Sequence, residues 1–256
     1  MISLDGKVTI ITGGSRGIGR ACVKFFAEAG SDVVFTYNKA VSQSKKFIEE
    51  LAYTKRKIKA YRCNLDNDKE AEQQIIEIVK SIIEEFGRID VLVNNAGIWE
   101  YGEADKMTLE NWNRTLTINL TGSMLFTREV IPYMKKQGGG KIIIITSTAG
   151  QRGEAFHSHY AASKGALISY VKSLSTELAP YKILVNSVAP GWVDTEMNDE
   201  VFSDLNYKEQ IRESIPLKKI ATAEDIAGPV LFLASDLANH ITGEILNVNG
   251  GSVLCG

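Results

Sequence analysis

Short runs of apolar residues alternate with amphipathic segments of helical length along the whole chain of 256 residues. The segment 70–86 shows the helical pattern, because Ile75, Val79 and Ile82 recur at three- and four-residue spacing. Such alternation predicts an α/β fold, in which helices cover both faces of a parallel sheet. No linker, repeat or low-complexity tract interrupts it, so we expect a single domain over 1–256. The predicted strands span 8–12, 33–37, 57–62, 91–94, 141–146, 184–189 and 245–248.

The composition excludes several classes of partner. A formal net charge of −2 argues against nucleic acid or an anionic membrane surface. No apolar stretch approaches the roughly 20 residues of a membrane span, and the N-terminal residues lack the apolar core of a signal peptide. Cys22, Cys63 and Cys255 are too widely spaced for a metal site or a disulfide framework. We therefore expect a cytoplasmic protein with no bound metal.

A glycine-rich segment follows the first predicted strand directly. It reads Gly13-Gly14-Ser15-Arg16-Gly17-Ile18-Gly19, and an amphipathic helix begins within it. Glycines allow a tight turn and a close approach of the backbone to a ligand, while the free N–H groups of a helix N-terminus favour a pyrophosphate. Because the segment opens a strand–helix–strand unit, it predicts a dinucleotide site. The alternative is a tight turn that binds nothing.

The end of the second predicted strand indicates which dinucleotide is bound. An acidic residue there would bind the 2′-hydroxyl of NAD and repel a 2′-phosphate. This chain instead has Thr36-Tyr37-Asn38-Lys39, with no acid. Arg16 and Lys39 can pair with a phosphate. The residues therefore predict NADP(H) in preference to NAD(H).

Tyr160 and Lys164 form a candidate acid–base pair. Their four-residue spacing places them one helical turn apart, where the ammonium would lower the tyrosine pKa from about 10. Ser147 follows the apolar run 141–146, so its hydroxyl is expected at the carboxyl edge of the sheet, where such sheets bind ligands. A lone pair of this kind could equally lie on the surface of an amphipathic helix. With Ser147, it predicts a proton-transfer site.

One long helix is predicted over 111–136, and its centre is weak. Residues 115–122 read Thr-Leu-Thr-Ile-Asn-Leu-Thr-Gly, and Thr, Asn and Gly are poor residues for a helix interior. The run predicts a kink, at which Asn119 could hold a water molecule near Lys164. The alternative is a weak turn that the helix tolerates.

The stretch 194–216 differs from the rest of the chain. It is polar, weakly periodic and bounded by proline-containing turns. Long loops within a compact domain are usually functional. Because this one follows a strand, we expect it to fold over a ligand as a lid.

Together these motifs resemble the short-chain dehydrogenase/reductase family. The resemblance extends over nearly the whole chain and implies a Rossmann-type, doubly wound sheet of seven parallel strands with helices in two outer layers. It also implies an NAD(P)-dependent oxidoreductase. The motifs are Thr12-Gly13-x-x-x-Gly17-x-Gly19, Asn94-Asn95-Ala96-Gly97, Asn119, Ser147, Tyr160-x-x-x-Lys164, Pro190-Gly191 with Thr195, and Asn247-Val-Asn-Gly250-Gly251.

The resemblance assigns roles to these residues. Ser147 would position the carbonyl and Tyr160 would transfer the proton. Lys164 would bind the nicotinamide ribose and lower the tyrosine pKa, and Asn119 would hold a water. The implied cofactor contacts are Asn64 and Leu65 at the adenine, Asn95 at the ribose, Val193 and Thr195 at the carboxamide, and also Ala96, Gly97, Pro190, Gly191, Tyr160, Lys164 and the glycine segment.

Within the family, the chain is most similar to bacterial 3-oxoacyl-(acyl-carrier-protein) reductases. This implies reduction of a thioester-linked ketone in fatty acid biosynthesis, a homotetramer, and acyl carrier protein as a partner. Gln137-Gly138 and Tyr181 stand where such reductases have arginines that dock the carrier, although Lys135, Lys136 and Lys182 are near.

Two alternatives stay open. The first is a sugar or polyol dehydrogenase similar to glucose 1-dehydrogenase, since Trp99, Tyr101, Glu154 and His157 could line a polar pocket for a hydroxylated substrate. The second is a non-catalytic dinucleotide-binding protein. Such proteins usually lack the tyrosine or the lysine, and both are present here.

Overall fold

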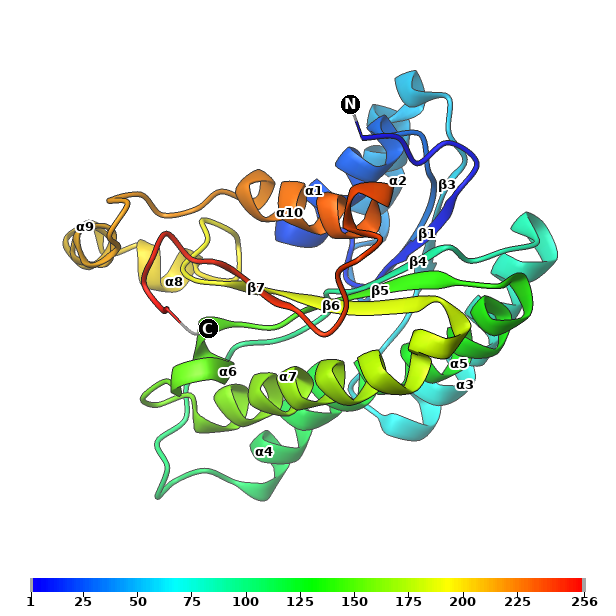
Figure 1. Ribbon diagram of the computed structural model, residues 1–256. Helices are drawn as coiled ribbons and strands as arrows, with labels where there is room; N and C mark the ends of the chain where they lie inside the picture. Colours follow the sequence, from blue (N-terminus) through cyan, green and yellow to red (C-terminus); the bar gives the residue numbers. More distant parts are fainter. Residues whose placement is uncertain (1, 255–256) are drawn as a thin grey trace.

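Figure 1 shows the computed structural model of the protein, in which residues 2–254 are described. Seven strands form one sheet in the order β3-β2-β1-β4-β5-β6-β7, and every pair of neighbours is parallel. The Rossmann-type sheet is thus confirmed, and each predicted strand end lies within one residue of the observed one. The strands are β1 Val8–Ile11, β2 Asp32–Tyr37, β3 Ile58–Arg62, β4 Val91–Asn94, β5 Gly140–Ile145, β6 Ile183–Pro190 and β7 Ile245–Val248.

Helices cover both faces of this sheet, as predicted (Figure 1). One face carries α1 Gly17–Glu28, α2 Val41–Glu50 and α10 Ala223–Ala234, and the other carries α3 Asp68–Phe86, α5 Gly122–Gln137 and α7 Ser158–Leu178. The shorter helices are α4 Leu109–Leu116, α6 Thr148–Arg152, α8 Asp199–Phe202 and α9 Leu205–Ser214, with single 3₁₀ turns at Ala52–Thr54, Ala179–Tyr181 and Asp236–Ala238.

The core lies in two layers, one on each side of the sheet. Strand β5 shows why, because successive side chains of a strand point to opposite faces. Ile142 and Ile144 pack in one apolar cluster, whereas Ile143 and Ile145 pack in the other. Burying each such side chain contributes about 1.5–3 kcal/mol, so a register shift of one residue would not be tolerated.

The strand order reverses between β1 and β4. From β1 the chain winds towards β3, and from β4 it winds the other way towards β7. In open α/β sheets, ligands bind at the carboxyl ends of the strands beside such a reversal. Residues that follow β1, β4, β5 and β6 therefore meet at one edge.

The predicted kink within 111–136 is confirmed as a π-helical turn. Residues Thr117–Thr121 separate α4 from α5, and the N–H of Gly122 donates to the carbonyl of Thr117, five residues earlier. Such turns carry one extra residue. The weak helix formers of this run therefore mark a real irregularity.

Residues 194–216 hold more regular structure than the sequence predicted. Helices α8 and α9 occupy most of the stretch, and Phe202, Ile211 and Ile215 form a small apolar cluster against Trp192. Asp204 caps α9 by accepting from two backbone N–H groups. Weak periodicity hid these elements because both helices are short and most residues of α9 are exposed.

Three further observations bear on the sequence predictions. Over residues 2–254, every helix is too short or too polar to cross a bilayer. In the same range, no group of three or more His, Cys, Asp or Glu side chains could hold a metal ion. Cys22 and Cys63 are buried free thiols, and Cys255 lies outside the described residues.

Candidate active site

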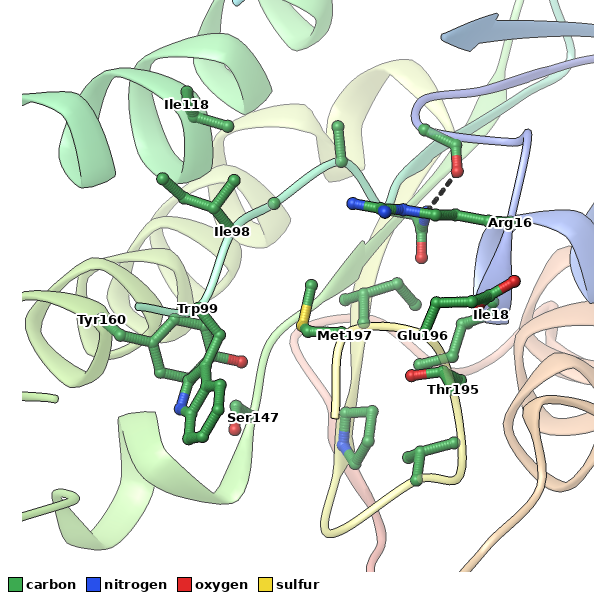
Figure 2. A pocket seen from close by; sticks show the side chains of 18 of the residues that line it. Arg16, Ile18, Ile98, Trp99, Ile118, Ser147, Tyr160, Thr195, Glu196 and Met197 are labelled. Atoms are coloured by element: carbon green, nitrogen blue, oxygen red, sulfur yellow. Dashed lines mark hydrogen bonds between the residues drawn. The ribbon is translucent and has the colours of Figure 1, made fainter. Parts of the chain in front are cut away.

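A cavity of about 460 Å³ lies along the carboxyl edge of the sheet. The glycine segment lines one end, with Arg16 and Ile18, and Ser147 and Tyr160 line the other (Figure 2). Met197 projects between these two ends. Two motifs that are more than 100 residues apart in the sequence thus share one space.

Thr12 fastens the glycine segment to the end of β4. Its hydroxyl accepts hydrogen bonds of 2.9 Å from the backbone N–H groups of Asn95 and Ala96. The Asn95 side chain donates in return to the carbonyls of Thr12 and Gly13. On the other side, the Gly13 N–H donates to the hydroxyl of Thr36 at the end of β2. Three strand ends therefore hold the turn in place.

Two glycines are required by close backbone contacts in this turn. A Cβ at Gly19 would lie 2.2 Å from the carbonyl oxygen of Gly13, and a Cβ at Gly14 would lie 2.5 Å from Cβ of Phe35. Gly19 does not itself line the cavity. It lets α1 pack against the turn, and its direct contact with the cofactor stays a prediction.

The N-terminus of α1 is open towards the cavity. Arg16 occupies the N-cap without a capping side-chain hydrogen bond, and the first turn contains no acidic residue. The free N–H groups of the first turn of α1 and the partial positive charge of this helix end suit a phosphate group. The arrangement fits the dinucleotide that the sequence predicted.

The residues that end β2 also line the cavity, and none of them is acidic. Tyr37, Asn38 and Lys39 lie there with Arg16. Arg16 and Lys39 are exposed and form no salt bridge with any other residue of 2–254. Both cations are therefore free to meet a 2′-phosphate.

Tyr160 and Ser147 face each other at the other end of the cavity (Figure 2). Ser147 is the N-cap of α6, where its hydroxyl accepts a hydrogen bond from the Ala149 N–H. Tyr160 lies in the first turn of α7, and its hydroxyl is directed towards that of Ser147. The two hydroxyls present a paired donor set suited to a carbonyl oxygen.

The predicted lowering of the tyrosine pKa is wrong for the ligand-free protein. Burial raises the pKa of Tyr160 to about 12, the Ser147 hydroxyl opposes this, and the negative charge of Glu154 adds to it. Lys164 lies 5.8 Å from the ring centroid and donates instead to the carbonyl of Ile145 at 2.7 Å. Burial also lowers the pKa of Lys164 to about 8. Desolvation therefore outweighs the attraction that the spacing suggested.

Asn119 lies in the π-helical turn beside Lys164 but outside the cavity lining. Its side chain is fully engaged, because it accepts from the Ile98 N–H and donates to the Ile98 carbonyl and the Ser163 hydroxyl. The side chain thus holds the loop after β4 against α7. The predicted water-holding role stays a prediction.

The cavity contains most of the residues predicted to bind the cofactor. Asn64 does not line it: its side chain accepts from Asn38, so it supports a neighbour of the ligand space. The predicted residues in the lining are Gly13, Ser15, Arg16, Gly17, Ile18, Tyr37, Asn38, Lys39, Leu65, Asn95, Ala96, Gly97, Ser147, Tyr160, Lys164, Pro190, Gly191, Val193 and Thr195.

The sequence reasoning missed several lining residues. Asp66 and Trp192 adjoin predicted positions and could have been included on that ground. Arg114 could not, because it lies in α4 and forms ion pairs with Asp66 and Glu100 from two separate loops. Four residues were predicted to line a polar pocket for a hydroxylated substrate. Two of them, Trp99 and Glu154, line the cavity. Tyr101 and His157 do not, since Tyr101 is 63% exposed and His157 packs behind Trp99.

Comparison with known proteins agrees with this geometry. A family model described as enoyl-(acyl carrier protein) reductase matches residues 13–252. The chain belongs to the short-chain dehydrogenase/reductase family. It is 40% identical over 250 residues to a 3-oxoacyl-(acyl-carrier-protein) reductase of Aquifex aeolicus, with 98% of each chain covered.

Other proteins that resemble the chain carry names that refer to a sugar or a sugar acid. It is 36% identical over 258 residues to an L-rhamnose 1-dehydrogenase (NAD(P)(+)) of Azotobacter vinelandii, again with 98% of each chain covered. Among solved structures, it matches a protein of Beutenbergia cavernae described as an NAD(P)-dependent gluconate 5-dehydrogenase with bound NADP. That match has a TM-score of 0.91, 32% identity and 98% coverage of both chains.

Proposed function

We propose that this protein reduces a ketone to a secondary alcohol with NADP(H), and that a 3-oxoacyl thioester is its substrate. The observation that carries the proposal is the single cavity shared by the glycine segment and the pair of hydroxyls. Similarity to the Aquifex reductase supports the thioester, and with this substrate the proposed reaction would belong to the class 1.1.1.100.

The residues fit the proposed cofactor. The open N-terminus of α1 would hold its pyrophosphate, and Arg16 with Lys39 would hold the 2′-phosphate. When bound, NADPH supplies the hydride. These residues act only on binding and orientation.

Tyr160 would supply the proton. Because its pKa is raised, the phenol is protonated at neutral pH and can donate to the carbonyl oxygen as negative charge builds there. The Ser147 hydroxyl would donate a second hydrogen bond to the same oxygen. Lys164 would contribute a nearby cation and fix α7 to the end of β5.

A second candidate substrate is a sugar or another hydroxylated ketone. The observation that favours it is the carboxyl group of Glu154, which lies in the cavity wall. A straight acyl chain has no use for a half-buried acceptor of this kind. The two sugar dehydrogenases above point the same way.

A screen of NADPH and NADH oxidation would test the proposal. It pairs an acetoacetyl thioester with simple ketoses and diketones. Oxidation of NADPH by the thioester alone supports the first candidate, and oxidation by ketoses alone supports the second. No turnover with any carbonyl compound would refute the proposed reaction. Light scattering would test the homotetramer expected for the family, since a monomer would contradict it.

A further inference from the structure

Glu154 places a carboxyl group at the catalytic end of the cavity, where carbonyl reduction does not require one. It lies in the short loop between α6 and α7, and its side chain is only 23% exposed. Its charge acts on Tyr160 and helps to raise the pKa of that phenol. A half-buried acidic group so close to the proton donor needs a reason.

Only one of its two oxygens is used within the protein. The indole N–H of Trp99 donates to Oε1 at 3.3 Å, and His157 Nδ1 lies 3.9 Å from the same atom. Within residues 2–254, Oε2 has no hydrogen-bond partner. Burial raises the pKa of Glu154, whereas His157, Trp99 and Arg152 lower it. Burial has the largest effect, so the pKa of Glu154 lies above its ordinary value, and Oε2 is left as an acceptor that the described residues do not use.

The neighbours of Glu154 are held firmly. The Trp99 indole stacks on the His157 ring at 4.1 Å with an interplanar angle of 6° and meets the Trp192 ring edge-on at 6.0 Å. His157 is fixed in turn by a 3.0 Å contact between Nδ1 and the Ala155 carbonyl. The indole also lies beside Tyr160 and Ser147 in the cavity (Figure 2). The donor to Oε1 of Glu154 is therefore held in place by the packing of two rings.

We propose that Glu154 is a specificity-determining residue, whose Oε2 accepts a hydrogen bond from a hydroxyl group that the substrate carries next to its reacting carbonyl. The inference rests on the second candidate function above, the reduction of a hydroxylated ketone at Tyr160, and it specifies that the hydroxyl group lies next to the reacting carbonyl. A substrate with a methyl group in that place would strip water from the carboxylate and leave it unpaired.

Two ketones of nearly equal size test this preference. Hydroxyacetone and butan-2-one differ by a hydroxyl against a methyl group, and their kcat/KM ratio is measured for the wild type, Glu154→Leu and Glu154→Gln. Comparing ratios between variants removes the difference in intrinsic reactivity. Since a hydrogen bond to a charged group contributes about 1.5–3 kcal/mol, Glu154→Leu should lower the ratio about 10- to 100-fold.

The remaining variant serves as a control. Glu154→Gln keeps a polar group of the same shape and should keep most of the preference. Circular dichroism and thermal unfolding of both variants show whether they fold. A ratio that Glu154→Leu leaves within twofold of the wild-type value would overturn the inference while the proposed reaction stands.

Failure of the proposed reaction is a separate outcome. If no ketone is reduced by the wild type with NADPH, binding of propane-1,2-diol and butan-2-ol is compared by saturation-transfer NMR. Stronger binding of the diol to the wild type than to Glu154→Leu supports the role of Glu154. Equal binding to both proteins contradicts it.

Discussion

Lys164 donates a 2.7 Å hydrogen bond to the backbone carbonyl of Ile145, the last residue of β5. The bond ties α7 to the strand end that leads into Ser147. Ser147 and Tyr160, which would act on a carbonyl, are therefore held at a fixed position relative to each other. Burial of this lysine also has an energetic consequence, because it lowers the pKa of Lys164 to about 8.

The first prediction concerns stability and pH. The folded, ligand-free protein holds the Lys164 proton less tightly than the unfolded chain, whose lysine pKa is about 10.4. Between these values the unfolded state binds more protons, so stability rises with pH. The free energy of unfolding of the wild type relative to Lys164→Met should rise by about 2 kcal/mol from pH 7.5 to 10. Urea denaturation of both proteins at both pH values measures this difference in the free energy of unfolding. A difference that does not change with pH would contradict the lowered pKa of the buried Lys164.

The second prediction concerns the proton donor. Tyr160→Phe should lower kcat for carbonyl reduction about 100- to 10,000-fold, because it removes the hydroxyl and little volume. The affinity for NADPH, measured by fluorescence titration, should stay within a few-fold. Tyr170→Phe changes a half-buried tyrosine on the same helix outside the cavity and should leave kcat near the wild-type value. Normal turnover by Tyr160→Phe would end the assignment.

The third prediction concerns cofactor choice. Arg16→Ala should lower kcat/KM for NADPH about 10- to 100-fold and leave that for NADH nearly unchanged, since only the 2′-phosphate is lost as a partner. Arg20→Ala is the matched control, because Arg20 pairs with Glu50 outside the main cavity. Steady-state kinetics with both cofactors measure the effect. Equal losses for NADPH and NADH would show that Arg16 does not read the 2′-phosphate.

The fourth prediction concerns the glycine segment. Gly19→Ala would force a methyl group against the Gly13 carbonyl and should cost about 1–3 kcal/mol of stability, with weaker NADPH binding. Gly228→Ala lies within α10, where an added Cβ would meet no atom of residues 2–254 within 4 Å. It should be neutral or stabilise by about 0.5–1 kcal/mol. Thermal unfolding of both variants distinguishes these outcomes, and an unchanged Tm for Gly19→Ala would argue against the tight packing.

Much of the framework could be predicted because its signals are local. A run such as 141–146 indicates a buried strand by itself, and the glycine segment indicates its own turn. Thr, Asn and Gly within a predicted helix also indicated the irregularity that the structure shows as a π-helical turn. Parallel topology then brings strand ends together, so Ser147 and Gly13 could be expected at one edge.

The remaining features depend on contacts between distant segments. The sequence suggested Trp99 and His157 as parts of one polar pocket, but the stacking that places one behind the other arises only when the loop after β4 meets the start of α7. The direction of the Tyr160 pKa shift could likewise not be predicted from the sequence. Helical spacing shows that Lys164 is near, whereas burial and the Ile145 carbonyl decide where its ammonium points.

The π-helical turn makes chain length, and not only residue type, matter at Thr117–Thr121. Loss of a single residue there would restore an uninterrupted α-helix and rotate everything on one side of it by about 100°. Asn119 would then no longer face Ile98, or Phe126 and Val130 would leave the interior. A change of even one position in this stretch would therefore separate the cavity edge from the core.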